Sequence, residues 1–189
     1  MRFRRILERI GEVAAYDLSK TLQFKPVEVT TPLGIAPTQL LKEQPVLATI
    51  LRAGLPLHQG MLNYFDKADN AFISAYRKHH PDGSFEISLE YLSCPDLNGR
   101  VLILCDPMLA TGASLVETIQ AIQKTYTPAQ IHIVVTIASE KGIAHVEKEL
   151  GADTPIWCAA IDPILNDKSY IVPGLGDAGD LAFGTKMQS

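Results

Sequence analysis

The sequence predicts an α/β protein with a mostly parallel central sheet flanked by helices. Three short apolar runs, Val101–Cys105, Ile131–Ala138 and Ile156–Ile161, do not alternate with polar residues, which is typical of parallel strands buried on both faces. Helical patterns at 113–125 and 140–150 lie between these runs, as in successive βαβ units. The length of 189 residues, with 47% hydrophobic and 20% charged residues, suits one packed domain.

The first third of the chain predicts two helices and several strands. Residues 2–22 carry apolar side chains at three- and four-residue spacing, which indicates an amphipathic helix. Residues 26–42 contain alternating apolar positions around a turn, so we expect short strands and loop there. A short apolar run at 46–51 predicts a buried strand, and 55–65 predicts a helix with Pro56 in its first turn.

The middle of the chain predicts a hairpin. Ala71–Arg77 and Phe85–Leu92 both alternate apolar with polar residues, and Asp82-Gly83 between them is a strong turn signal. We therefore expect a projecting hairpin over residues 76–92. Residues 170–180 are rich in Gly and Pro, and no regular structure is expected there.

Composition excludes several classes of protein. The formal charge of −4 argues against a general nucleic-acid binder, and no stretch approaches the roughly 18 apolar residues of a membrane helix. The charged N-terminus is not a secretory signal. The three cysteines, Cys94, Cys105 and Cys158, lack metal-binding spacing, so we expect reduced thiols in a cytoplasmic protein.

The segment from Val101 to Ser114 carries the clearest chemical signal. An apolar strand leads into Asp106, then a loop of small residues, then a helix that opens with Thr111-Gly112-Ala113-Ser114. Exposed backbone N–H groups and two hydroxyls at a helix start suit a phosphate, although no Walker A motif is present. Asp106 would repel a phosphate, so it more plausibly accepts hydrogen bonds from sugar hydroxyls. A capping loop without a ligand is the alternative.

Asp106-Pro107-Met108-Leu109-Ala110-Thr111-Gly112, followed by a small residue and Ser114, resembles the phosphoribosyl-diphosphate (PRPP) loop of the uracil phosphoribosyltransferase family. Other segments resemble the same family at matching spacing: Ile50–Leu55, Tyr76-Arg77, Tyr170–Asp180 and Phe183–Lys186. The resemblance covers nearly the whole chain. It implies a type I phosphoribosyltransferase fold, with residues 1–189 as one domain, 76–92 as a hairpin, and 162–189 as a small hood over the base site.

The resemblance also implies an activity, in which uracil and PRPP give UMP and diphosphate. The catalytic positions would be Arg52, Arg77, Asp106 and Asp177. PRPP would be bound by Arg52, Arg77, Asp106, Pro107, Met108, Leu109, Ala110, Thr111, Gly112, Ala113, Ser114 and Asp177. Uracil would be bound by Ile171, Gly176, Asp177 and Ala178. Mg²⁺ would be held mainly through PRPP and by no protein ligand directly, and a homodimer and a GTP effector are further expectations.

Two departures from the family pattern concern the PRPP loop and the N-terminus. Ala113 stands where many members have a second glycine, and a helical backbone would tolerate its methyl group. Members usually carry a further N-terminal segment, so Met1 is expected to be an internal methionine of a longer protein.

Other functions stay open at this point. One is a ligand-sensing or RNA-binding regulator on the same fold, although the charge of −4 weighs against RNA. Another is a phosphoribosyltransferase for a purine base. Gly174–Gly179 also spells GxGxxG, but Pro173 precedes it and only ten residues follow it, unlike a dinucleotide fingerprint.

Overall fold

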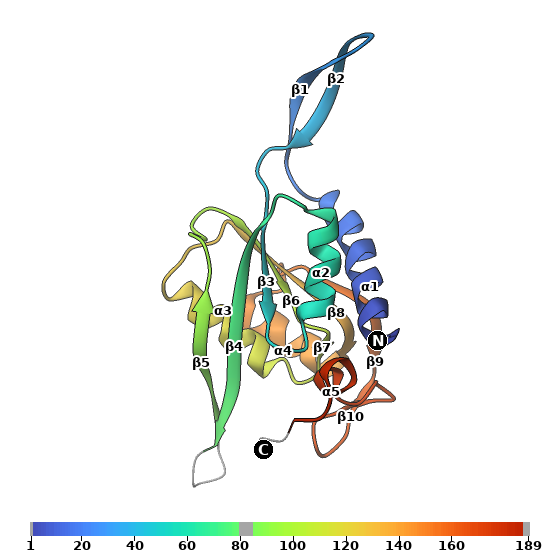
Figure 1. The fold of residues 1–189 in the computed structure, drawn as a ribbon. Helices are drawn as coiled ribbons and strands as arrows, with labels where there is room; N and C mark the ends of the chain where they lie inside the picture. The colour runs from blue at the N-terminus through green and yellow to red at the C-terminus, as the bar shows by residue number, and fades with distance from the viewer. Residues whose placement is uncertain (1, 80–84, 187–189) are drawn as a thin grey trace.

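A seven-stranded sheet forms the centre of the molecule (Figure 1). The structure is a computed structural model that describes residues 2–79 and 85–186. Within these residues the strands of the main sheet are β3 (Val46–Ile50), β4 (Asp69–His79), β5 (Phe85–Ser93), β6 (Val101–Cys105), β7 (Met108–Leu109), β8 (Gln130–Ser139) and β9 (Ile156–Asp162).

The sheet is mostly parallel, as predicted. Strands β4, β3, β6, β8 and β9 lie in this spatial order, and each neighbouring pair is parallel. Strand β5 pairs with β4 in the antiparallel direction and forms one edge. The predicted turn at Asp82-Gly83 lies outside the described residues, so only the two strands of that hairpin can be compared with the prediction.

Helices cover both faces of the sheet. Helices α1 (Arg2–Ser19) and α2 (Leu55–Tyr64) pack on one face against alternate side chains such as Ile103 and Cys105 of β6. Helices α3 (Ala113–Gln123) and α4 (Glu140–Leu150) pack on the other face against Leu102 and Leu104. Burial on both sides explains why β6 is continuously apolar rather than alternating.

A second hairpin, β1 (Phe24–Thr31) with β2 (Gly34–Leu41), stands away from the body of the molecule (Figure 1). The sequence predicted only short strands and loop here. Its apolar side chains are exposed, Leu33 by 99% and Ile35 by 65%. The apolar side chains of the hairpin therefore pack little, and its two strands are held together by the backbone hydrogen bonds of the antiparallel pair.

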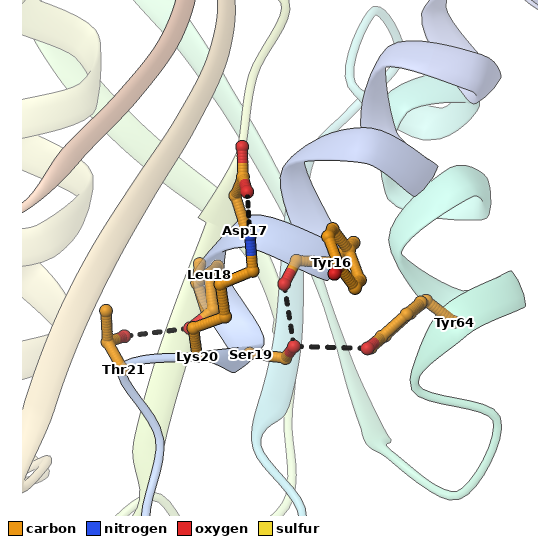
Figure 2. A network of polar contacts seen from close by, with 7 residues as sticks. All are labelled: Tyr16, Asp17, Leu18, Ser19, Lys20, Thr21 and Tyr64. Atoms are coloured by element: carbon orange, nitrogen blue, oxygen red, sulfur yellow. Dashed lines mark hydrogen bonds and ion pairs between the residues drawn. The ribbon is translucent and has the colours of Figure 1, made fainter.

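The end of α1, which precedes this hairpin in the chain, is held by side-chain hydrogen bonds. The hydroxyl of Ser19 donates to the carbonyl of Tyr16 over 2.7 Å and lies 3.1 Å from the hydroxyl of Tyr64. Figure 2 shows the same turn, where Thr21 donates to the Leu18 carbonyl. These contacts hold the last turn of α1 and join it to the end of α2.

The C-terminal segment contains regular structure that the sequence did not predict. Strands β10 (Ile164–Leu165) and β11 (Ile171–Val172) form a short antiparallel pair, and α5 (Ala178–Phe183) follows. These elements are too short to show a hydrophobic period. Among the described residues, no helix combines the length and apolar character needed to cross a membrane.

Candidate active site

A cleft of about 440 Å³ opens at the carboxyl ends of β3 and β6, under the C-terminal segment. Ligands of open α/β sheets bind at this edge. Its lining comes from three stretches of chain: Ile50–Ala53, Asp106–Ser114 in part, and the C-terminal segment. The lining residues are Ile50, Leu51, Arg52, Ala53, Asp106, Pro107, Met108, Ala110, Ser114, Lys168, Ser169, Tyr170, Gly176, Asp177, Ala178, Gly179 and Lys186.

A larger cavity of about 550 Å³ lies elsewhere, between α1 and β9. Its lining is mainly apolar, with Ile10, Val13 and Trp157 among the residues, and Arg9 and Asp17 supply its charge. The cleft at the strand ends instead gathers two carboxylates and three cationic side chains. Convergent polar groups mark a site for a charged ligand, so the cleft is the candidate active site.

The loop after β6 is held firmly against β8. The carbonyl of Pro107 accepts hydrogen bonds from the amides of Thr136 and Ile137 at 3.0 and 3.1 Å. The next two residues form β7, which pairs in parallel with Ile137 and Ala138. The loop is therefore a fixed wall of the cleft and needs no ligand to shape it.

Helix α3 begins at the end of this loop with a glycine as its N-cap residue. Its N-cap, Gly112, has φ +80, a left-handed conformation that glycine adopts without steric conflict. Glycine has no side chain with which to cap the helix, and Oγ1 of Thr111 accepts the amide N–H of Ala113 over 3.4 Å. Ala113 is the first helical residue, as predicted. The first-turn N–H groups of a helix whose N-cap is a glycine favour an anionic group such as a phosphate.

Asp106 stands at the floor of the cleft, where β6 ends. Burial raises the pKa of its carboxyl to about 7, and a hydrogen bond from the backbone of Met108 acts in the opposite direction. Its remaining exposed surface lines the cleft. The charged form of a carboxylate removed from water in this way is stabilised by hydrogen-bond donors or a cation that a ligand brings.

Arg52 follows β3 and reaches toward the C-terminal segment. Its Nη2 donates to Oδ1 of Asp180 at 3.0 Å and to the carbonyl of Gly184 at 2.7 Å. The peptide bond between Leu51 and Arg52 is cis. The guanidinium thus lies between the loop after β3 and helix α5, beside the cleft.

The C-terminal segment lines one side of the cleft. Asp177 caps α5, and its Oδ1 accepts the amide N–H of Asp180 at 2.8 Å. Gly176 and Ala178, on either side of it, also line the cleft. The carboxylate of Asp162 accepts the amide N–H of Gly174 at 3.0 Å and fixes the start of this loop to the end of β9.

The structure brings most of the predicted site residues together. Those that line the cleft are Arg52, Asp106, Pro107, Met108, Ala110, Ser114, Gly176, Asp177 and Ala178. Those outside its lining are Leu109, Thr111, Gly112, Ala113 and Ile171. Ile171 is buried, at 2% exposure, in β11. Arg77 lies in β4 opposite Ile87, and its side chain is outside the described part of the structure.

Sequence reasoning gave no role to several residues of the site. Lys168, Ser169, Tyr170 and Lys186 line the cleft, and Asp180 holds Arg52. Ser169 has φ 62, which is unusual for a residue with a side chain. Lys168 and Ser169 carry no pattern that would have identified them, whereas Asp180 stood within the Gly-Asp repeat of the C-terminal motif.

The described residues contain no group of three His, Cys, Asp or Glu side chains that could hold a metal ion. The cleft does present Asp106 and Asp177, and carboxylate oxygens are the donors that Mg²⁺ prefers. This donor set fits a Mg²⁺ ion that takes most of its ligands from water and from a bound diphosphate.

Comparisons with known proteins identify relatives along the whole chain. A family model described as uracil phosphoribosyltransferase matches residues 1–185. The uracil phosphoribosyltransferase of Porphyromonas gingivalis is 51% identical over 187 residues, which cover 99% of this chain and 87% of that protein. The enzyme of that name from Methanothermobacter thermautotrophicus is 39% identical, covering 96% and 83% respectively.

Solved structures share the fold. The Aquifex aeolicus protein AQ2163 superposes with a TM-score of 0.87 at 31% identity, covering 97% of this chain and 86% of that one. A hypoxanthine phosphoribosyltransferase from Staphylococcus aureus gives a TM-score of 0.56 at 14% identity, covering 86% and 76%. At that identity the likeness concerns the fold alone.

Proposed function

This chain belongs to the uracil phosphoribosyltransferase family, and we propose on this basis that it transfers the phosphoribosyl group of PRPP to uracil. The products are UMP and diphosphate. The observation that carries the proposal is the cleft, which combines Ser114 in the first turn of α3, an arginine and two carboxylates at the carboxyl edge of a parallel sheet. The relatives give no support to the alternative of a non-enzymatic regulator, nor to a purine base as substrate.

The residues around the start of α3 are proposed to hold the ribose-5-phosphate part of PRPP. The N–H groups in the first turn of α3 and the hydroxyls of Thr111 and Ser114 suit its phosphate. Asp106 faces the cleft beside them and is suited to accept hydrogen bonds from ribose hydroxyls. The remaining loop residues shape this wall through the pairing of β7 with β8.

Arg52 is proposed to bind the diphosphate, together with Arg77. During transfer, N1 of uracil bonds to the anomeric carbon and releases its proton to the solvent, while the bond from that carbon to the diphosphate oxygen breaks and its electron pair leaves with the diphosphate. Negative charge builds on the leaving diphosphate, and a guanidinium fork matches its oxygens. Most of the catalysis therefore comes from positioning and charge stabilisation rather than from a protein nucleophile.

The hood is proposed to bind uracil through backbone groups of Ile171, Gly176 and Ala178, with Asp177 between the two subsites. Backbone donors and acceptors suit a neutral base because they are fixed and small. In this proposal residues 1–189 form one domain, in which 162–189 serve as the hood and 76–92 as the hairpin beside the cleft.

Mg²⁺ is proposed as the cofactor, bound through PRPP with Asp106 and Asp177 as the nearest carboxylates. It would supply charge neutralisation to the diphosphate. We also propose a cytoplasmic location, in keeping with the three unpaired cysteines. GTP as an effector remains part of the proposal on family grounds alone.

A homodimer is proposed from the surface of the molecule. The β1–β2 hairpin projects with exposed apolar side chains, and the cavity between α1 and β9 is also mainly apolar. Apolar surface of this kind is typical of an interface between subunits. A second copy of the chain would cover it.

Turnover of uracil with PRPP and Mg²⁺ tests the function. UMP and diphosphate should form only when all three are present. Arg52→Ala and Asp177→Asn should each lose at least about tenfold in kcat/KM, or roughly 1.4 kcal/mol. Glu149→Gln is the matched control, because Glu149 forms an ion pair with Lys148 at 2.9 Å and lies outside the lining of the cleft. Unchanged kinetics in both site variants would remove the site assignment, and hypoxanthine turnover above that of uracil would remove the substrate.

A further inference from the structure

The orientation of Arg52 is set by the far end of the chain. Its Nη2 donates to Oδ1 of Asp180 and to the carbonyl of Gly184, at 3.0 and 2.7 Å. The Arg52 and Asp180 side chains are 33% and 34% exposed, so the pair is partly removed from water. Such a pair holds its geometry better than an ion pair on the open surface.

The pair leaves Arg52 with donors to spare. A guanidinium has five N–H groups, and the two contacts to the C-terminal segment use Nη2 alone. Nε is buried and has no hydrogen-bond partner among the described residues. Asp180 therefore fixes the plane of the guanidinium without using the donors of Nε and Nη1, and an anion in the cleft can still be bound.

Asp180 also belongs to the hood. Its amide N–H donates to Asp177, the cap of α5, at 2.8 Å. The far end of α5 is held separately, because Arg4 donates to the carbonyl of Ala182 at 2.5 Å and lies 5.6 Å from the ring centroid of Phe183. A helix held at both ends gives Asp180 a fixed position from which to orient Arg52.

We propose that Asp180 is a positioning residue that holds Arg52 in the orientation required for diphosphate binding. Asp180 is absent from the lining of the cleft, so its action passes through Arg52. The inference rests on the proposed function, in which Arg52 contacts the diphosphate. It adds a physical link between the diphosphate subsite and the hood that binds the base.

Steady-state kinetics of Asp180→Asn test this role. The substitution keeps the shape of the side chain and removes its charge, so Arg52 loses its strongest orienting contact. KM for PRPP should rise and kcat/KM for PRPP should fall about tenfold, while KM for uracil changes less. If the Asp180 carboxylate acted only by repelling the negative charge of PRPP, its loss would tighten PRPP binding. A lower KM for PRPP, or an unchanged one, overturns the proposal.

A double-mutant cycle separates positioning from a general structural role. In an Arg52→Ala background, Asp180→Asn should change kcat/KM by less than about twofold, because the residue through which it acts is gone. An equal loss in both backgrounds overturns the proposal. Asp162→Asn is the matched control, since Asp162 holds the hood at Gly174 without touching Arg52, and its effect should be the same in both backgrounds.

Two further measurements keep the outcomes distinct. If a thermal melt shows that Asp180→Asn does not fold, Asp180→Glu replaces it. Its effect on kcat/KM is then compared between the wild-type and Arg52→Ala backgrounds in the same way. Wild-type turnover is measured first, with binding of magnesium diphosphate followed by calorimetry. If the wild type shows neither turnover nor binding of magnesium diphosphate, the proposed function and this inference are both overturned. If the wild type turns over normally and Asp180→Asn has the same kinetics, this inference alone is overturned.

Discussion

The buried hydroxyl of Ser139 donates to the carbonyl of Ala110 at 2.5 Å, and so joins the wall of the cleft to the start of α4. The same oxygen accepts the amide N–H of Gly142 at 2.8 Å and caps the helix. One side chain therefore satisfies two backbone groups that would otherwise be unpaired, one of them in the proposed PRPP loop.

Ser139→Ala should therefore weaken both the fold and PRPP binding. Two backbone groups would lose their partner in a buried place, and we expect the free energy of unfolding to fall by about 1–3 kcal/mol. KM for PRPP should rise several-fold with little change in KM for uracil. Urea unfolding and steady-state kinetics measure both effects. Thr154→Ala is the control, since Thr154 donates to Leu150 at the opposite end of α4; an equal rise in KM there would contradict the assignment.

Asp106 should make the free protein less stable as the pH rises. Its pKa is raised from 3.8 to about 7 in the fold, so the folded state binds more protons than the unfolded state between these values. Stability is therefore lost as the pH increases through this window. Asp106→Asn, which cannot ionise, should have the same Tm as the wild type near pH 4 and a higher one at pH 8. A constant Tm difference at all pH values would contradict this.

Gly54→Ala should displace the loop that carries Arg52. A Cβ at Gly54 would lie 2.3 Å from Oγ1 of Thr49, 2.7 Å from the carbonyl oxygen of Cys105 and 2.9 Å from that of Ile50. We expect a loss of about 1–3 kcal/mol in the free energy of unfolding and reduced kcat/KM for PRPP. Adding Thr49→Ala should not restore either value, because the two carbonyl groups remain. Recovery in the double variant would mean that the added methyl group conflicts with the Thr49 side chain alone and not with the two carbonyl groups.

The exposed hairpin should control assembly. A variant with Leu33→Glu and Ile35→Glu puts charge on the apolar surface of β1–β2, and the proposed homodimer should dissociate at micromolar concentration in sedimentation experiments. The Tm of the monomer should change little, because both side chains are exposed. Thr38→Glu, on the same hairpin, is the control for added charge. A dimer that persists in the double variant would place the interface elsewhere.

The sequence predicted the buried part of the fold well, for a physical reason. Strands such as Val101–Cys105 are covered on both faces, so their burial appears directly as an apolar run. The elements that it missed lack this signal. Helix α5 has six residues, too few to show a period. The alternation in residues 26–42 indicated short strands, but it did not reveal that they pair as one long projecting hairpin. Local patterns cannot reveal them.

The same contrast holds for the site. Asp106 and Gly112 could be predicted because an acid and a glycine stand between an apolar strand and a helix. The contact of Arg52 with Asp180 joins residues far apart in the chain, and only the folded backbone brings them together. Lys168 lines the cleft from an exposed turn, and no local pattern distinguishes it from other surface lysines.

The position of β3 between β4 and β6 imposes an order on folding during synthesis. Every residue of β3 is buried in the folded protein, but β6 follows it only after α2 and the β4–β5 hairpin have been made. Until residues 101–105 leave the ribosome, one edge of an apolar strand has no partner and can pair with other nascent chains. Chains interrupted before this point should therefore aggregate more than the chain that contains all strands of the sheet.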